Sequence, residues 1–537
     1  MVRLSLLGLF LTAVACEPST PAPAERFSQD RLMEHIRTLS SDEFGGRSPG
    51  SAGEEKTVAY LTDAFRSYGL AAGNPDGTYV HKVPLVGITN TSRVSLVRSG
   101  GEEELADGEA YVAWTKRVVE EVAVEAELVY VGYGVVAPEY DWDDYKGVDV
   151  MGKILVMLVN DPPTEGAFGD EAMTYYGRWT YKYEIAAQKG AAGAFIVHET
   201  GPAGYPWEVV RGSWLGEQFD LETEDRNAGR VAVEGWFSRS AAQSLFERAG
   251  LDLAEQKRAA ADRAFQPLPL GVSLRASIKN QLRNVDSKNV VARVVGAEVP
   301  EETILYVAHW DHLGTQEGGN GDKIYNGAYD NATGTAGLLE LARAFAALEP
   351  TPRRSVLFLA VTAEEQGLLG SRFYARHPLY SPSETVAAIN MDGLNIWGRT
   401  TDVTVVGMGQ SSLDDLAREL AAAQGRVLEP DAEPEKGYYY RSDHFELAKI
   451  GIPAFYPDVG VHFEGKPEGW GKQRRENYVA EDYHKPSDEV KDWYDLSGMV
   501  QDLDLFFAMG ERLATSDEWP EWSETSEFRA VREASRP

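Results

Sequence analysis

Three short apolar runs in the sequence are each followed closely by side chains that can bind a metal ion. The runs and these side chains are ILYVA at 304–308 with His309, VLFLAV at 356–361 with Glu364 and Glu365, and VAAI at 386–389 with Asp392. Continuous apolar runs of this length are typical of strands buried in a parallel sheet. Because ligands of an open parallel sheet bind beyond the carboxyl ends of its strands, we expect these imidazole and carboxylate groups to lie together.

Two other segments carry groups of the same kind. Asp330 lies in a glycine-rich loop at 326–337 (NGAYDNATGTAG), directly before a segment with the apolar spacing of a helix. Its carboxylate either caps that helix or faces a bound group, and the residues alone leave both interpretations open. His484 lies in a turn-rich segment at 482–488 (DYHKPSD).

The composition narrows the chemistry that these groups can perform. The 537 residues include a single cysteine, Cys16, so neither an intramolecular disulfide nor a thiolate zinc cluster can form. The formal net charge is −32, and a field of that sign repels phosphate backbones, so nucleic acid is excluded as an expected partner. Any zinc site must therefore use histidine and carboxylate ligands.

The candidate segments occur in the order AHWDHLG, GAYDNATG, TAEEQGLLGS, NMDG and YHKPSD. In this order they resemble the successive motifs of the M28 family of co-catalytic zinc peptidases, which includes bacterial leucyl-type aminopeptidases and glutamate carboxypeptidase. The resemblance covers about residues 27–90 and 284–515. It implies an α/β fold with a mixed, mostly parallel sheet flanked by helices, the zinc exopeptidase fold, and two Zn²⁺ ions as cofactors.

The resemblance also implies which residues hold the metal ions. Carried over position by position, it assigns His309 and Asp392 to one zinc ion and Glu365 and His484 to the other, with Asp330 bridging both. Histidine nitrogen and carboxylate oxygen are ligands that zinc accepts. The family pattern therefore predicts a two-metal site built from five side chains.

Residues next to these ligands receive roles from the same resemblance. Glu364 would act as general base toward a metal-bridged water and then give the proton to the leaving amine. Tyr483 would donate a hydrogen bond to the tetrahedral oxyanion. Asp311 would orient the imidazole two residues before it, and the family geometry has a cis peptide bond between Asp330 and Asn331.

The substrate is less defined by the sequence than the metal site. Arg441 and Asp443, in the segment RSDH, match a part of the family near the substrate and are candidate pocket residues. We expect an exported aminopeptidase that removes N-terminal residues from peptides. One alternative is a carboxypeptidase for acidic peptides, which needs arginines to meet the substrate carboxylates; another is a non-catalytic, receptor-like protein. Relatives with this domain plan can dimerise, so a homodimer is left open.

The middle of the chain has a different texture. Residues 101–283 contain short β-rich runs between glycine- and aspartate-rich turns, with strands expected at 128–136, 153–159 and 192–197 and a helix at 182–189. This segment resembles a protease-associated (PA) domain inserted into the peptidase. The remainder divides into a first peptidase part at 27–100, a second at 284–515 and a C-terminal tail at 516–537.

The N-terminus has the layout of a signal peptide. Residues 1–16 (MVRLSLLGLFLTAVAC) place one positive charge before an apolar stretch that is too short to span a membrane. The last four residues resemble a bacterial lipobox without its usual leucine, and they also fit an ordinary cleavage site. A proline-rich linker follows at 17–26. We expect export to the bacterial cell envelope or periplasm with a lipid on Cys16 as the only membrane attachment, or otherwise secretion.

Overall fold

The computed structural model describes residues 26–164, 168, 172–214, 216–316 and 321–536. The predicted signal peptide and lipobox at 1–16, and the linker at 17–26 apart from its last residue, lie outside the described residues. Within the described part of the chain, no helix is both long enough and apolar enough to cross a membrane.

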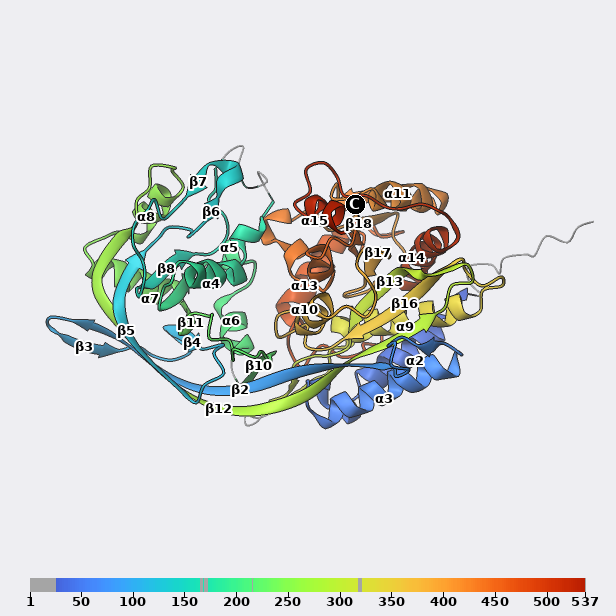
Figure 1. Ribbon diagram of the computed structural model, residues 1–537, viewed down its shortest axis with the longest axis horizontal. Helices are drawn as coiled ribbons and strands as arrows, with labels where there is room; N and C mark the ends of the chain where they lie inside the picture. The colour runs from blue at the N-terminus through green and yellow to red at the C-terminus, as the bar shows by residue number, and fades with distance from the viewer. Residues whose placement is uncertain (1–25, 165–167, 169–171, 215, 317–320, 537) are drawn as a thin grey trace, which may run out of the picture.

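The chain forms two lobes that lie side by side and are joined by two long strands (Figure 1). These strands are β2 (Val80–Arg98) and β12 (Leu268–Val294), which pair antiparallel along nearly the whole of β2. β12 runs through residue 283, where the inserted segment is expected to end, so one 14-stranded sheet extends through both lobes. The division of the chain into two domains stays a prediction.

The sheet of the right-hand lobe is mixed and mostly parallel. Its strand order is β20 (Ala454–Phe455), β17 (Thr385–Asn390), β13 (Val299–His309), β16 (Arg354–Val361) and β12. β20, β17, β13 and β16 are parallel to one another, and β12 is antiparallel to β16. All residues of β16 and β17 are buried, as expected for continuous apolar runs.

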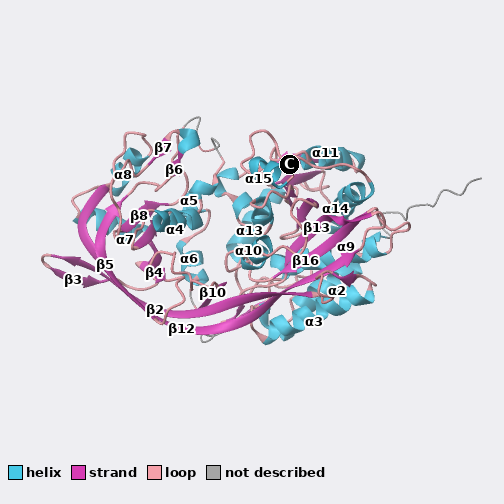
Figure 2. Cartoon of the chain, in the orientation of Figure 1, coloured by secondary structure: helices cyan, strands magenta, loops and turns pink. Residues whose placement is uncertain are grey.

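Helices cover both faces of this sheet (Figure 2). On one face, Tyr306 and Phe358 pack in a core with α2 (Gln29–Leu39), α3 (Ala52–Ser67), α9 (Gly334–Ala346) and α14 (Ser497–Thr515). On the other face, Leu305 and Leu357 pack against α10 (Leu369–Arg376) and α12 (His444–Ala448). Alternate strand residues thus point to opposite helical layers, and the predicted α/β fold class is confirmed.

The left-hand lobe of Figure 1 is β-rich and has a separate hydrophobic core, whose buried residues lie between Val94 and Ile278. From β12 its strands follow in the order β5 (Glu121–Tyr130), β8 (Ile154–Leu158), β9 (Gly193–Val197), β11 (Val233–Phe237) and β4 (Tyr111–Trp114). The strand expected at 128–136 ends at Tyr130, because Gly132 and Gly134 have left-handed φ values of 61° and 67° and turn the chain. The helix expected at 182–189 is α4 and begins earlier, at Trp179 (Trp179–Gln188).

The remaining elements are short strands and helices at the edges of the two lobes. They are β1 (Ala71–Ala72), β3 (Gly101–Glu104), β6 (Val136–Ala137), β7 (Trp142–Asp143), β10 (Glu217–Leu221), β14 (Gly314–Thr315), β15 (Ile324–Tyr325), β18 (Asp402–Val405), β19 (Val427–Pro430), β21 (Pro457–Asp458), α5 (Thr200–Ala203), α6 (Trp207–Ser213), α7 (Arg239–Arg248), α8 (Leu253–Ala260), α11 (Leu413–Ala423), α13 (Trp470–Glu481) and α15 (Arg529–Ser535).

Candidate metal centre and substrate site

The predicted ligands follow the ends of neighbouring strands. β13 ends at His309, β16 ends shortly before Glu364 and Glu365, and β17 ends shortly before Asp392. β13 lies between the other two strands and is parallel to both, so the three carboxyl ends meet at one edge of the sheet. Strand topology alone therefore brings together groups that are up to 83 residues apart in the sequence.

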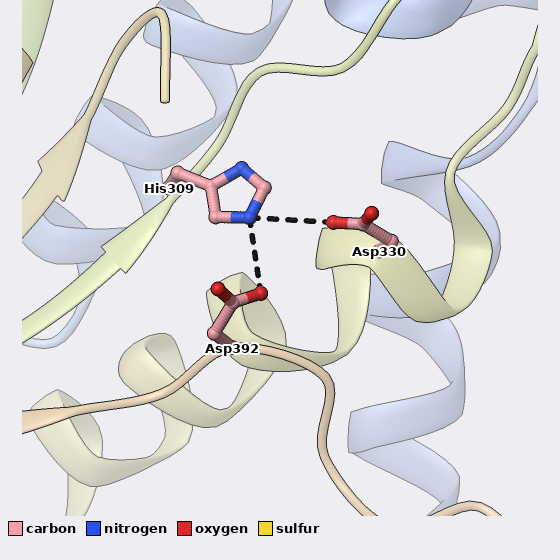
Figure 3. A group of neighbouring side chains, drawn as sticks. All are labelled: His309, Asp330 and Asp392. Atoms are coloured by element: carbon pink, nitrogen blue, oxygen red, sulfur yellow. Dashed lines mark hydrogen bonds and ion pairs between the residues drawn. The ribbon is translucent and has the colours of Figure 1, made fainter. Parts of the chain in front are cut away.

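The imidazole of His309 faces two carboxylates (Figure 3). Its Nε2 lies 3.2 Å from Oδ1 of Asp392 and 3.3 Å from Oδ1 of Asp330. Asp330 comes from the loop before α9, and Asp392 from the segment after β17. One donor atom from each of the three residues lies within 4.8 Å of the others, a spacing that a single metal ion can bridge.

A second group of candidate metal-donor atoms lies around the other carboxylate oxygen of Asp330. Nε2 of His484 lies 3.0 Å from Oε2 of Glu365 and 3.5 Å from Oδ2 of Asp330. Each oxygen of Asp330 therefore faces a different histidine. His312 contacts the remaining oxygen of Glu365, with its Nδ1 2.6 Å from Oε1. His312, Asp330 and Glu365 also lie close enough together to hold a metal ion.

The loop that carries Asp330 is held in an unusual backbone conformation. Gly327 has a φ of +57°, and a Cβ there would lie 2.3 Å from the carbonyl oxygen of Asp330, so only glycine fits. The peptide bond between Asp330 and Asn331 is cis, as the resemblance implies. The Asn331 side chain donates to the carbonyl of Met391 (3.0 Å) and accepts from the backbone N–H of Gly393 (3.1 Å). It thereby ties this loop to the segment of Asp392.

The backbone of Glu364 and Glu365 is held by the carboxylate of Asp311. It follows Ala363, whose backbone has the left-handed conformation. Ala363 has a φ of 53°, a conformation that non-glycine residues adopt rarely and mostly where surrounding structure enforces it. The Asp311 carboxylate accepts the backbone N–H groups of Glu364 (3.0 Å) and Glu365 (3.4 Å). Its Oδ1 also lies 3.8 Å from Nδ1 of His309. Asp311 thus positions the glutamate pair and lies behind the imidazole at longer range.

Mutual proximity and burial shift the protonation of these groups. Burial lowers the pKa of His484, but the carboxylates of Glu365 and Asp330 outweigh it and raise that pKa to about 10. Burial raises the pKa of Glu364 well above its usual value; His309 opposes this rise, and the carboxylate of Asp392 adds to it. The clustered carboxylates therefore favour positive charge on the neighbouring imidazole, a role that a bound cation would take over.

Tyr483 lies against the candidate metal ligands. Its ring stacks on the imidazole of His484, with centroids 3.9 Å apart and planes at 29°. Burial raises the pKa of Tyr483 well above its usual value, and the carboxylates of Asp330 and Glu365 raise it further. The phenol therefore keeps its proton near neutral pH and is available as a hydrogen-bond donor.

Residues 289–504 match the sequence profile of Peptidase family M28. Over this range, hereafter the M28 part, the chain is similar to peptidase family M28. The matched range contains β13, β16 and β17 together with all five predicted ligands.

Related proteins agree with this assignment over limited stretches. "Aminopeptidase NAALADL1" of Mus musculus is 35% identical over 136 residues, which cover 24% of this chain and 17% of the mouse protein. A "Probable zinc metalloprotease" of Pyrenophora tritici-repentis is 33% identical over 108 residues, covering 20% of this chain and 22% of the fungal protein. The match thus spans about a fifth of the length of these curated relatives.

One solved structure resembles nearly the whole chain. The "Aminopeptidase from Aneurinibacillus sp. strain AM-1" aligns over 93% of this chain and 97% of its own, with a TM-score of 0.54 and 22% sequence identity. The likeness in fold therefore takes in the left-hand lobe as well as the M28 part.

Two cavities meet at the candidate metal ligands of the M28 part. Both are lined by Glu364, Glu365, Tyr483 and His484. The first cavity extends mainly within the M28 part, although Gly204, Tyr205 and Val209 of the left-hand lobe also line it. Its wall is largely aromatic and includes Tyr329, Trp397, Tyr456, Phe463 and Tyr478. The second extends toward the left-hand lobe, which contributes Tyr175, Arg178, Trp179, Trp214 and Trp236. A substrate reaching Glu364 can therefore occupy a cavity on either side.

The structure separates the two predicted pocket residues. Arg441 lines both cavities. Asp443 is fully buried and accepts a hydrogen bond from the hydroxyl of Ser371 at 2.6 Å, and it lines neither cavity. Its neighbour Ser442 instead contacts the centre directly, donating to Oδ2 of Asp392 at 2.6 Å.

Three further residues of the site were not predicted. Asp488 accepts the backbone N–H of Tyr329 at 3.0 Å and of Asp330 at 3.1 Å, and its place in the YHKPSD motif was a usable signal. Arg47 donates to four main-chain carbonyls, and no local pattern marks it. Arg178 comes from the left-hand lobe, and only the packing of the lobes brings it here.

Proposed function

We propose that this protein is a co-catalytic dizinc exopeptidase, and specifically an aminopeptidase that removes N-terminal residues from peptides. The observation that carries the proposal is the position of Asp330. Its two oxygens face His309 and His484 separately, and each histidine also faces a second carboxylate. Two ions that share one carboxylate fit this arrangement.

The donor set fits zinc. Each proposed ion would have one imidazole nitrogen, one carboxylate of its own and one oxygen of Asp330, which leaves room for a further ligand as in catalytic zinc sites. His309 and Asp392 would hold one ion, and Glu365 and His484 the other. When bound, zinc would lower the pKa of a water molecule toward neutrality and polarise the substrate carbonyl.

The protein groups around the ions would move protons and stabilise charge. Glu364 lies on the surface shared by the two cavities, where it can take a proton from the attacking water and give it to the leaving amine. Asp311 fixes the backbone of Glu364 for this task. Tyr483, held against His484, would donate to the oxygen that becomes negatively charged.

The surroundings of the catalytic part belong to the same proposal. We propose that the left-hand lobe is a PA-like insert, that the substrate is a peptide, and that the protein is exported with Cys16 lipidated. Cys16→Ser should then move the protein from the membrane fraction to the soluble fraction of the cell envelope. An unchanged distribution of the Cys16→Ser protein would argue against the lipid anchor.

Blocking either end of the substrate tests the direction of cleavage. With the zinc-loaded protein, we expect N-acetylation of a peptide to lower kcat/KM at least about 100-fold, because the site then loses its amine contacts. C-terminal amidation of a longer peptide should leave cleavage at the N-terminus in place. Rapid cleavage of N-acetylated peptides that amidation abolishes would instead identify a carboxypeptidase.

A further inference from the structure

Strand β10 contacts the turn that carries Glu364 and Glu365. β10 lies within residues 101–283, outside the M28 part, and pairs antiparallel with β2, one of the two long strands that join the lobes (Figure 1). The backbone N–H of Phe219, at the centre of β10, donates to the side-chain oxygen Oε1 of Gln366 at 3.1 Å. The residue that follows the glutamate pair is therefore tied to a distant segment of the chain.

The residue before the glutamate pair rests on the same strand. Ala363 is fully buried in a small apolar cluster that also contains Phe219 and Leu221 of β10 and Leu369. Its left-handed φ of 53° is a conformation that non-glycine residues keep only where surrounding structure holds it. The pair is thus supported by β10 on both sides, by apolar packing before it and by a hydrogen bond after it.

The position of Gln366 restrains that of Glu364 through the turn between them. The carbonyl of Glu364 accepts the backbone N–H groups of Gly367 at 2.8 Å and of Leu368 at 2.9 Å. These two bonds close a compact turn with Gln366 inside it. Asp311 in addition accepts the backbone N–H of Glu364. A shift of the anchored side chain would therefore move the backbone that carries the proposed base.

The anchor on β10 is itself fixed. The carbonyl of Phe219 accepts a hydrogen bond from Nζ of Lys116 at 2.9 Å, and Phe219 and Lys116 are only 2% and 6% exposed. The main chain of Phe219 thus contacts side chains from two different segments, one through its N–H and one through its carbonyl. Because a buried polar group is costly to leave without a partner, Phe219 with its two bonds is a fixed point that holds the turn.

We propose that Gln366 is a positioning residue for Glu364, which it holds in place by anchoring the turn to β10. Gln366 lines the second cavity, but its oxygen is already bound to Phe219, so it fixes the backbone and does not touch the reacting atoms. The inference rests on the proposed function and deepens it, because it makes a strand outside the M28 part a determinant of the rate of proton transfer. Misplacing a catalytic group by about 1 Å can cost on the order of 100-fold in rate.

Kinetics of two Gln366 variants test this role. Gln366→Met removes the acceptor and keeps the length of the side chain. With the zinc-loaded protein and the peptide Leu-Leu-Leu, we expect kcat to fall about 10- to 100-fold while KM changes less than about threefold. Zinc content should equal that of the unmodified protein, because Gln366 is not a proposed ligand. Gln366→Glu keeps an acceptor oxygen at the same distance from the backbone and should hold kcat within about threefold of the unmodified value.

Hydrogen–deuterium exchange measures the anchor directly and needs no turnover. We expect Gln366→Met to speed the exchange of backbone amides in residues 217–221 and 363–368 at least about fivefold, since both segments lose the bond that joins them. Gln29→Met, which changes an exposed glutamine of α2, is the matched control and should leave exchange in these segments, kcat and KM unchanged. Circular dichroism melting of each variant checks that it is folded.

Three kinetic results would overturn the inference: an unchanged kcat in folded Gln366→Met, a fall in kcat that accompanies loss of bound zinc, and the same fall in Gln366→Glu. Unchanged exchange of residues 363–368 in Gln366→Met would also overturn it, because Gln366 would then not hold the turn. If the unmodified zinc-loaded protein cleaves no peptide at all, the proposed function fails instead, and the exchange measurement alone decides whether the anchor exists.

Discussion

The two lobes bury carboxylates in contrasting surroundings. In the left-hand lobe, Asp144 accepts the indole N–H of Trp142 (2.8 Å) and the backbone N–H of Val135 (2.9 Å). In the M28 part, the ion-pair partners of Asp330, Glu365 and Asp392 among the described residues are all histidines. The first arrangement satisfies one acid internally, whereas the second collects several acids around weak bases.

This difference separates structural acids from functional ones. An acid whose oxygens are already occupied by protein donors has a local structural role. Acids that face one another across shared imidazoles are held together against their own repulsion, which surrounding structure must enforce. The contrast therefore predicts that substitutions in the two lobes will affect different measurable properties.

Removing the shared carboxylate should have the largest effect. Asp330→Asn would take one ligand from each proposed ion, so we expect at least about a thousandfold loss of kcat/KM and a clear loss of bound zinc. Zinc content by elemental analysis and peptide hydrolysis measure the two losses. Retention of two tightly bound ions by Asp330→Asn would contradict the functional role of Asp330 that sets it apart from Asp144.

Substitution of Arg47, which holds the backbone next to the candidate metal ligands, should affect stability more than catalysis. Arg47 is buried and donates to the carbonyls of Leu39, Trp310, Asn326 and Gly327. Arg47→Met leaves these carbonyls without donors, so we expect the free energy of unfolding in urea to fall by about 3 kcal/mol or more. Arg37→Met, at an exposed position of α2, should change it by less than about 0.5 kcal/mol.

The smallest expected effect is a pH dependence of the free energy of unfolding, caused by Asp144 of the left-hand lobe. Burial raises the pKa of Asp144 to about 6, compared with about 3.9 for an unfolded chain. Between these values the folded protein holds a proton that the unfolded chain has lost, so this residue makes stability fall as pH rises from about 4 to 6. Asp144→Asn should remove on the order of 2 kcal/mol of this dependence.

Urea unfolding at several pH values between 4 and 7 measures this contribution. Asp149→Asn, at an exposed position in the same lobe, serves as the control and should follow the unmodified protein. Peptide hydrolysis at pH 7 by Asp144→Asn should stay within about twofold, because the acid is structural. A pH profile of stability unchanged by Asp144→Asn would show that its carboxylate does not titrate in this range.

The clustering of the candidate metal ligands could be predicted because its signals are local in sequence. Each buried strand is a continuous apolar run, and its candidate ligand ends the strand or follows it within four residues, so topology supplies the rest. The end of β5 was placed too late, since an apolar run does not reveal that Gly132 and Gly134 turn the chain. Arg178 and Arg47 could not be predicted, because their partners and neighbours come from distant segments brought together by packing.

In the proposed mechanism, Glu364 performs proton transfer at a two-zinc centre that other residues hold. The most direct test compares zinc content and peptide hydrolysis of the unmodified protein and of Glu364→Gln. We expect two zinc ions per chain in both proteins, with kcat lowered about 100- to 10,000-fold in the variant. Unchanged turnover by zinc-loaded Glu364→Gln, or a single zinc ion in the fully active protein, would contradict it.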